Sequence, residues 1–271
     1  MTDDIDRTTR KIAKLQRKTR ERNELKEIML PQWPDTKRGT PNSFLRSALF
    51  SAVQSKDRAD LKEVVLASQA GFTIKYTGQQ LNQEDLTLWE TLVHLSKKSP
   101  LGDECEFTAY EILNTLNLNT GADGYKTLHS GITRLTACAV EINKDGAGRG
   151  FMGSLIEFSE NHNIESTTRY KIKLGRILIK LYNDNTCWID FGQRQLLKRK
   201  PLAQFLHGYY SSHLSCYRIK IETLHKLSGS NVKSMTKYKQ NLDKAHHELK
   251  KIDFIDDYCI EDNGLVWIKR N

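Results

Sequence analysis

The feature that most constrains this chain is an order of elements that the sequence predicts twice: strand, helix, turn, helix and β-hairpin. In the first copy, a strand over residues 104–107 precedes helices over residues 109–116 and 126–138. Two β-prone segments, residues 139–142 and 151–158, then flank the glycine-rich stretch Gly146-Ala-Gly-Arg-Gly150. Strand-forming segments on either side of a glycine turn are typical of a hairpin.

The second copy lies in the C-terminal part of the chain. Residues 216–221 form its predicted strand, residues 222–227 a short helix and residues 234–251 a long helix, with Gly229 as the break between the helices. Its hairpin has arms over residues 254–260 and 265–269, joined by Asp262-Asn-Gly264, and Asn-Gly is a strong hairpin signal. The repeated order therefore predicts two units of the same kind in tandem.

A helix-turn-helix that runs into a β-hairpin is a winged-helix unit, so the sequence predicts an α+β fold with tandem winged-helix domains. We expect a basic N-terminal arm and linker over residues 1–42, a first winged-helix domain over residues 43–175 and a second over residues 176–271. The arm is rich in Lys and Arg between Arg7 and Arg22, and Pro and Gly interrupt residues 30–42. A chain of 271 residues is long enough for two cores of ordinary size.

The charge balance favours an anionic partner. Lys and Arg number 42 against 33 Asp and Glu, a formal net charge of +9 that is typical of chains that contact nucleic acid. The five cysteines form no C-x-x-C pair, so we expect no metal site and no cofactor. The sequence has neither a signal-peptide pattern nor an apolar run that could span a bilayer, and we therefore expect a cytoplasmic protein that does not bind membranes.

The long helix predicted over residues 234–251 divides into an apolar and a basic face. The apolar face repeats at helical spacing, whereas the other face carries lysines, which neutralise phosphates, and amides, which pair with base edges. A solvated amphipathic surface would show a similar pattern, but the position before a hairpin favours DNA. The DNA contacts predicted in this unit are Lys233, Ser234, Thr236, Lys237, Gln240, Asn241 and Lys244, with Lys269 and Arg270 on its hairpin.

The helix predicted over residues 126–138 has the same division in a weaker form. Its predicted DNA contacts are Lys126, Thr127, Ser130 and Arg134, with Lys144 and Arg149 on the following hairpin. Because this face has fewer basic and amide groups, we expect the second unit to carry more of the sequence specificity. Asn241 is the amide expected to make a bidentate contact to adenine.

No pattern in the sequence predicts a catalytic site, and we expect no enzyme. There is no phosphate-binding loop of the G-x-x-x-x-G-K-[ST] kind. Tyr209 and Tyr210 lie near His207 and His213, an arrangement that invites comparison with nucleases that nick DNA through a tyrosine. Both tyrosines continue the apolar stripe of the helix that begins at Pro201, so they are predicted to be core residues.

Several short strings resemble TrfA-type plasmid replication initiators, from about residue 30 almost to the C-terminus. They are Trp33-Pro-Asp-Thr36, Arg46-Ser-Ala-Leu-Phe50, Ile74-Lys-Tyr-Thr-Gly78, Tyr210-Ser-Ser-His213 and Ile219-Lys-Ile-Glu-Thr-Leu224. One departure is the peptide through which such proteins contact the sliding clamp, Gln-Leu-x-Leu-Phe, which is replaced here by Glu24-Leu-Lys-Glu-Ile28. The resemblance therefore does not extend to clamp docking through this peptide.

The resemblance implies a plasmid replication initiator that binds direct repeats, or iterons, in the double-stranded origin. It also implies opening of an adjacent AT-rich segment, contact with the single strands, and recruitment of the host initiator and helicase. A homodimer would be the inactive form, which must dissociate to act. The alternative function is that of a winged-helix transcriptional repressor acting on its own operator, since it would use the same DNA contacts.

Overall fold

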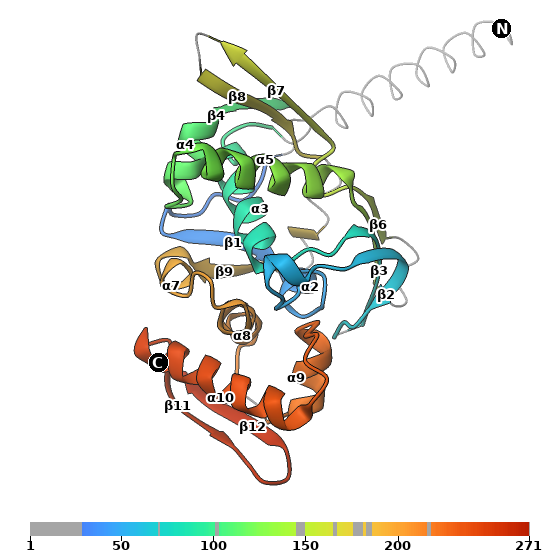
Figure 1. Cartoon of the computed structure of the whole chain (residues 1–271), viewed down its shortest axis with the longest axis vertical. Coiled ribbons are helices and arrows are strands. Elements are labelled where there is room, and N and C mark those ends of the chain that lie inside the picture. Colours follow the sequence, from blue (N-terminus) through green and yellow to red (C-terminus); the bar gives the residue numbers. More distant parts are fainter. Residues whose placement is uncertain are drawn as a thin grey trace, which may run out of the picture.

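The computed structural model describes residues 29–69, 71–100, 103–144, 150–164, 167–175, 181–182, 186–215 and 218–270. Helices and antiparallel sheets succeed one another along the long axis of the molecule (Figure 1), which confirms the mixed helix-and-sheet class. The basic arm over residues 7–22 and the segment Glu24-Leu-Lys-Glu-Ile28 lie outside the described residues. Within the described ranges, every helix is too short or too polar to traverse a lipid bilayer.

The first unit is built around two antiparallel sheets. One sheet has the order β2-β3-β5-β6, and its strands are β2 (Asp60–Leu66), β3 (Phe72–Gln79), β5 (Ala139–Lys144) and β6 (Gly150–Gly153). The other has the order β4-β8-β7, and its strands are β4 (Glu104–Thr108), β7 (Phe158–Ile164) and β8 (Thr167–Lys173). The helices of this unit are α2 (Asn42–Leu45), α3 (Gln83–Ser96), α4 (Ala109–Thr115) and α5 (Ala122–Ala137), with a 3-10 turn, η1, at Ser55–Asp57.

Helix α3 is the central element of this unit. A capping box starts it, in which the Asn82 side chain accepts hydrogen bonds from the first turn while the Asp85 carboxylate accepts one from the Asn82 backbone N–H. Its other residues face protein on nearly every side, and Trp89 is fully buried. Helix α5 packs so closely on α3 that a Cβ atom at Gly131 would lie 2.5 Å from the Leu88 side chain. The glycine therefore permits the close approach of the two helices.

The second unit has its own core. Its sheet has the order β10-β12-β11, formed by β10 (Ile219–Lys220), β11 (Ile255–Ile260) and β12 (Leu265–Arg270). Its helices are α8 (Pro201–Ser211), α9 (Ile221–Leu227) and α10 (Met235–Lys251). Buried side chains between Leu197 and Ile268 form one cluster here, whereas those between Leu30 and Ile189 form the cluster of the first unit. Each unit thus buries apolar surface of its own.

Several predicted boundaries differ from the structure. Residues 30–42 are not a linker outside the globular body, because β1 (Lys37–Pro41) pairs with β9 (Thr186–Asp190) and Trp33 is buried. The predicted limit of the first domain at residue 175 also falls too early, since Ile189 belongs to the first core. The strand predicted over residues 151–158 is divided between β6 and β7, which lie in different sheets. Sequence periodicity indicates which residues of a segment face a core, but it does not show which distant segments pair. It therefore could not predict the pairing of β1 with β9 or the separate sheets of β6 and β7.

A buried ion pair on α3 also reaches the second unit, because its cation, Arg194, donates from Nη1 to the Gln204 carbonyl of α8 at 3.5 Å. Helix α7 (Phe191–Leu196) places the Arg194 guanidinium against α3, with Nε 3.1 Å from Glu90 Oε2, and both side chains are fully inaccessible to solvent. Arg194 Nη2 donates to the Gln83 carbonyl at 3.0 Å, and Nε donates to Thr87 Oγ1 at 2.9 Å. The other carboxylate oxygen of Glu90 accepts a 2.6 Å hydrogen bond from Thr40 Oγ1. Segments that are far apart in the chain, around Thr40, Glu90 and Arg194, therefore converge on one charge pair.

Replacement of Arg194 by Met should lower the free energy of unfolding by about 3–5 kcal/mol, because it leaves the Glu90 carboxylate buried without its counterion. Urea denaturation measures this loss. Arg169→Met removes a cation from an exposed pair with Glu106 and should cost less than about 1 kcal/mol. The double variant Arg194→Met with Glu90→Leu should regain much of the loss. Equal effects of the Arg194 and Arg169 substitutions would contradict this role for the buried pair.

Buried histidines make the stability dependent on pH. Burial lowers the pKa of His207 to about 3 and the pKa of His246 to about 4. His246 is held in its neutral form by hydrogen bonds, since Nδ1–H donates to the Leu242 carbonyl and Nε2 accepts from the Tyr210 hydroxyl at 2.7 Å. These groups bind protons in the unfolded chain at a pH where the folded chain does not, so acid favours unfolding.

The free energy of unfolding should therefore fall as the pH drops from about 6.5, the ordinary histidine pKa, toward 4. Each such histidine contributes a slope of up to about 1.4 kcal/mol per pH unit. Urea titrations between pH 7.5 and 5 measure the total slope of the free energy of unfolding against pH. His246→Gln should reduce this slope by the contribution of one histidine, which is up to about 1.4 kcal/mol per pH unit. A free energy that stays constant over this interval would contradict the burial of neutral imidazoles.

Candidate nucleic-acid interface

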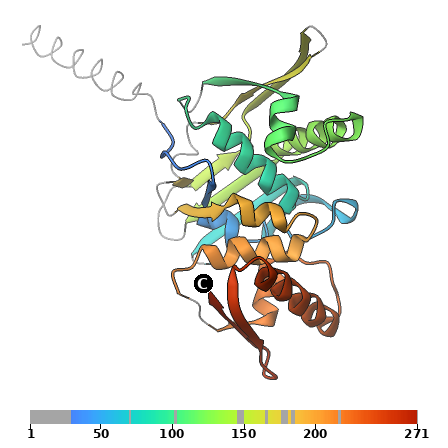
Figure 2. The same ribbon diagram turned by 90° about the vertical axis from the view of Figure 1, so that its left-hand side faces the viewer.

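The two long helices that follow the helix turns lie on the same side of the molecule. Helices α5 and α10 both face the viewer in Figure 1 and lie at the same edge of the quarter-turned view in Figure 2. Helix α5 follows α4 and leads into the β5–β6 hairpin, and α10 follows α9 and leads into the β11–β12 hairpin. The predicted order of elements along the chain is thus found in both units, with the helices on separate levels along the long axis. In the second unit the first strand, β10, pairs with the hairpin strand β12, whereas in the first unit β4 pairs with β8 and lies in a different sheet from the β5–β6 hairpin.

Local sequence explains the position of α10. Ser234 is its N-cap and accepts a hydrogen bond from the Lys237 backbone N–H, so the Ser234 hydroxyl is engaged in capping. The apolar side chains recur at helical spacing and are buried against the second core: Tyr238, Leu242, Ala245 and Leu249. The opposite face is consequently held toward solvent.

That outward face of α10 is basic and unneutralised. Thr236, Lys237, Gln240, Lys244 and His247 are all exposed, and Lys233 is exposed just before the helix. Among the ion pairs of the described residues, none involves Lys233, Lys237 or Lys244. His247 was not among the predicted contacts, although its spacing of seven residues from Gln240 was a sufficient signal. This surface can accept phosphate oxygens and offers an amide to a base edge.

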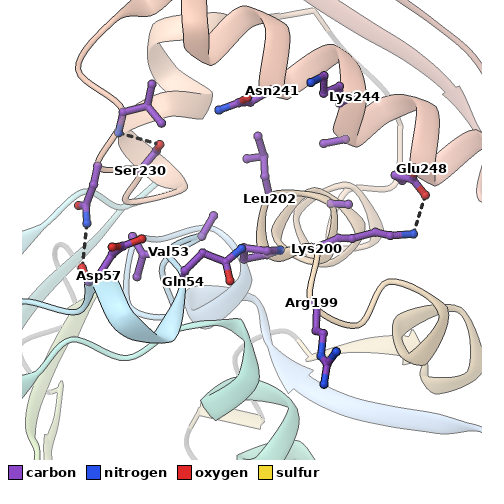
Figure 3. A pocket seen from close by; sticks show the side chains of 16 residues that line it. Val53, Gln54, Asp57, Arg199, Lys200, Leu202, Ser230, Asn241, Lys244 and Glu248 are labelled. Carbon is purple, nitrogen blue, oxygen red and sulfur yellow. Dashed lines mark hydrogen bonds and ion pairs between the residues drawn. The ribbon is translucent and has the colours of Figure 1, made fainter.

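Asn241 is placed differently from its prediction. It is half-buried and lines a cavity of about 600 Å³ between α10, the start of α8 and residues 52–57 of the first unit (Figure 3). Lys244 borders the same cavity but is exposed as well. Gln240, by contrast, stands on the open face of the helix. The geometry therefore favours Gln240 over Asn241 as the amide that reaches a base.

The weaker face of α5 loses one of its predicted contacts. Lys126, Thr127 and Ser130 are exposed, as predicted, on a helix that begins at Ala122 instead of Lys126. Arg134 was also expected to point outward, but its guanidinium binds the Asp85 carboxylate with two hydrogen bonds of 2.8 and 3.1 Å.

Asp85 is almost fully buried and needs counterions, which explains the position of Arg134. Its second oxygen, Oδ2, accepts a 2.6 Å hydrogen bond from Arg58 Nη1. A carboxylate held in the interior must be paired with cations, and Arg134 supplies one of them. Arg134 thus fixes α5 against α3, and its guanidinium is engaged by Asp85 instead of pointing outward.

The hairpin cations are distributed unequally. Lys144 is exposed at the end of β5, and Arg149 lies outside the described residues. Lys269 forms an exposed pair with Asp256 at 3.2 Å, which is weak enough to exchange for a phosphate. Arg270 Nη1 donates to the Tyr210 carbonyl at 2.9 Å and so binds the C-terminal end of α8. Of these residues, Lys144 and Lys269 remain the more accessible.

The tyrosines considered as nucleophiles lie in the second core, as their apolar stripe predicted. Tyr209 is 2% exposed and Tyr210 is 6% exposed. The Tyr209 hydroxyl donates to Gln69 Oε1 at 2.8 Å, and the Tyr210 hydroxyl lies 2.7 Å from His246 Nε2. In the part of the chain that the structure describes, no three His, Cys, Asp or Glu residues are grouped to hold a metal ion.

Comparisons with known proteins agree with this architecture. Two crystal structures of domains 2 and 3 of RctB share the fold, one with a TM-score of 0.59 and 12% identity over 85% of this chain and 98% of the RctB chain. The other has a TM-score of 0.53 and 10% identity over 83% of this chain and 95% of that chain.

Sequence comparisons identify the family. The chain is 28% identical over 258 residues to the plasmid replication initiator protein TrfA of Escherichia coli. The aligned region covers 92% of this chain and 67% of that protein. The family model of the TrfA protein matches residues 6–270. This chain, with the exposed helix faces described above, therefore belongs to the TrfA family of plasmid replication initiators.

Proposed function

We propose that this protein initiates plasmid replication by binding direct repeats in the plasmid origin through two winged-helix units. The observation that carries the proposal is the exposed basic and amide face of α10, on the same side of the molecule as α5. Each of these helices would enter the major groove, which admits an α-helix. Because successive major grooves recur on one side of DNA about every 10 base pairs, one repeat would span roughly two turns.

The two kinds of side chain on α10 would have different tasks. Lys233, Lys237 and Lys244 would neutralise phosphates and contribute affinity on any sequence. Gln240 would form paired hydrogen bonds with a base edge and contribute specificity. On the first unit, Lys126, Thr127 and Ser130 would position α5 on the backbone, and the hairpin residues Lys144 and Lys269 would contact phosphates beside each groove.

Binding energy, and not a chemical step by a side chain, would then open the origin. A protein that holds several adjacent repeats would bend and strain the neighbouring duplex, and pyrimidine–purine steps such as TA unstack most easily. The exposed single strands would allow the host initiator and helicase to assemble. Within this proposal the protein is cytoplasmic and non-enzymatic, needs no cofactor, and is inactive as a homodimer.

A DNA fragment that carries this gene and its flanking repeats should replicate autonomously in a suitable bacterial host, because the protein supplies initiation in its own right. Transformation with a fragment lacking other origins measures this directly. A fragment that represses a reporter through the repeats but never replicates would instead favour the alternative, a transcriptional repressor. Replacement of Tyr209 and Tyr210 by Phe should leave replication intact wherever the protein still folds.

Substitutions on α10 should separate specificity from general affinity. Gln240→Ala should cost about 1–3 kcal/mol on the cognate repeat and much less on shuffled DNA, because it removes a bidentate contact to a base. Lys237→Ala should weaken both complexes by similar factors. It should also lower the slope of log affinity on log salt by about 0.9, the value for one phosphate contact. Competition binding at fixed salt measures both effects.

Asn241→Ala is the matched control for the loss of an amide, since Asn241 faces the cavity. It should change the ratio of cognate to shuffled affinity less than Gln240→Ala does. If Asn241→Ala has the larger effect on this ratio, the assignment of Gln240 as the base-contacting amide is wrong.

A further inference from the structure

The loop between α7 and α8 contains the run Lys198-Arg199-Lys200, which belongs to neither helix face considered so far. It lies on the side of α5 and α10, between them along the long axis (Figures 1 and 2). Arg199 has a φ of 63°, a left-handed conformation that costs a non-glycine side chain energy. A surface loop would ordinarily place glycine or asparagine in this conformation.

The two lysines tie this loop to both units. Lys198 Nζ donates to the Asn117 carbonyl at 2.5 Å, in the turn between α4 and α5. Lys200 Nζ donates to Glu248 Oε2 on α10 at 2.6 Å. The loop is thus held at one end by the helix turn of the first unit and at the other by the long helix of the second.

Arg199 lies between the two lysines and has no hydrogen-bond or ion-pair partner among the residues that the structure describes. Its side chain is exposed and points away from α10 in Figure 3. No other residue in the described ranges forms a hydrogen bond or an ion pair with its guanidinium. Burial, and next the positive charge of Arg199, lower the pKa of the neighbouring Lys198. Lys200 shares Glu248 with Lys251, whereas Arg199 carries a charge that no acidic residue of the described ranges pairs with.

We infer that this loop is a third DNA contact, in which Arg199 binds backbone phosphates beside the minor groove between the two major grooves. The inference rests on the proposed function, because it takes α5 and α10 as the helices in those grooves. When two helices occupy successive major grooves on one side of B-DNA, the intervening protein surface faces the minor groove and its two backbones. The α7–α8 loop lies at this level, and its lysines are hydrogen-bonded to the turn that precedes α5 and to α10 itself.

Phosphate fits the chemistry of the loop better than a base edge does. Arginine presents a planar fork of donors that matches phosphate oxygens, and it remains charged when partly desolvated. A fixed left-handed backbone, held on both sides by lysine hydrogen bonds, would orient this fork before DNA arrives. Such a contact would raise the affinity and fix the position of the protein along the duplex, but it would not discriminate between base sequences.

The test measures binding of the full-length protein to a duplex carrying one repeat, at salt concentrations between 50 and 200 mM. Arg199→Ala should weaken binding about three- to tenfold and lower the slope of log affinity on log salt by about 0.9, the value for one lost phosphate. The ratio of cognate to shuffled affinity should stay unchanged. Arg199→Lys, which keeps the charge, should keep most of the slope.

Arg199→Gly separates binding from folding. Glycine relieves the left-handed strain, so this variant should melt at a higher temperature than the native protein while it loses as much affinity as Arg199→Ala. Lys37→Ala is the control for the loss of a cation that is already paired within the protein, because Lys37 Nζ lies 3.0 Å from Asp190 Oδ2. It should leave the salt slope unchanged.

Three results would overturn the inference. If the native protein binds the repeat but Arg199→Ala keeps the native salt slope, the loop contact is wrong while the proposed function stands. If Arg199→Gly regains native affinity, the arginine acts through backbone conformation and not through phosphate. If the native protein shows no preference for the repeat, the proposed function fails and the loop contact fails with it.

Discussion

The ion pair between Arg194 and Glu90 fixes the geometry on which the rest of the structure depends. It lies where α7 leaves the first core, and the guanidinium also donates to a backbone carbonyl and a threonine hydroxyl of α3. Its burial makes separation of the two units costly, since either charge alone would remain in a medium of low polarity. Contacts in the interior of the protein consequently hold the two units together before any DNA is bound. A protein that places two helices in successive major grooves requires a fixed spacing between those helices.

A second consequence concerns which cations remain available. Arg134 and Arg58 neutralise the buried Asp85, and Arg270 binds the end of α8, so these residues hold the architecture together. The lysines on the open face of α10, in contrast, have no acidic partner among the described residues. A net charge of +9 therefore says less about a binding surface than the pairing of each cation does. Free cations on one side of the molecule are the electrostatic signature of the proposed interface.

Local sequence patterns predicted the elements well where the signal is local. The stripe from Tyr238 to Leu249 and the Asn-Gly turn at Asn263 predicted α10 and its hairpin, because helical spacing and turn chemistry act within a few residues. Pairings between distant segments could not be predicted in this way. The pairing of β1 with β9 and the salt bridge of Arg134 depend on residues far away in the chain, and a Lys or Arg on a helix gives no sign of its partner. The same limit applies to Asn241, because the cavity that it faces is formed partly by residues 52–57, which are distant in the sequence.

The central claim is that one rigid chain reads two successive major grooves within a single repeat. Dimethyl sulfate protection of guanine N7 atoms, which lie in the major groove, tests it most directly on a duplex that carries one repeat from the DNA flanking the gene. Two protected tracts on one side of the duplex, about 10 base pairs apart, are the predicted result. A single protected tract, or protection that does not depend on the repeat sequence, would contradict the claim.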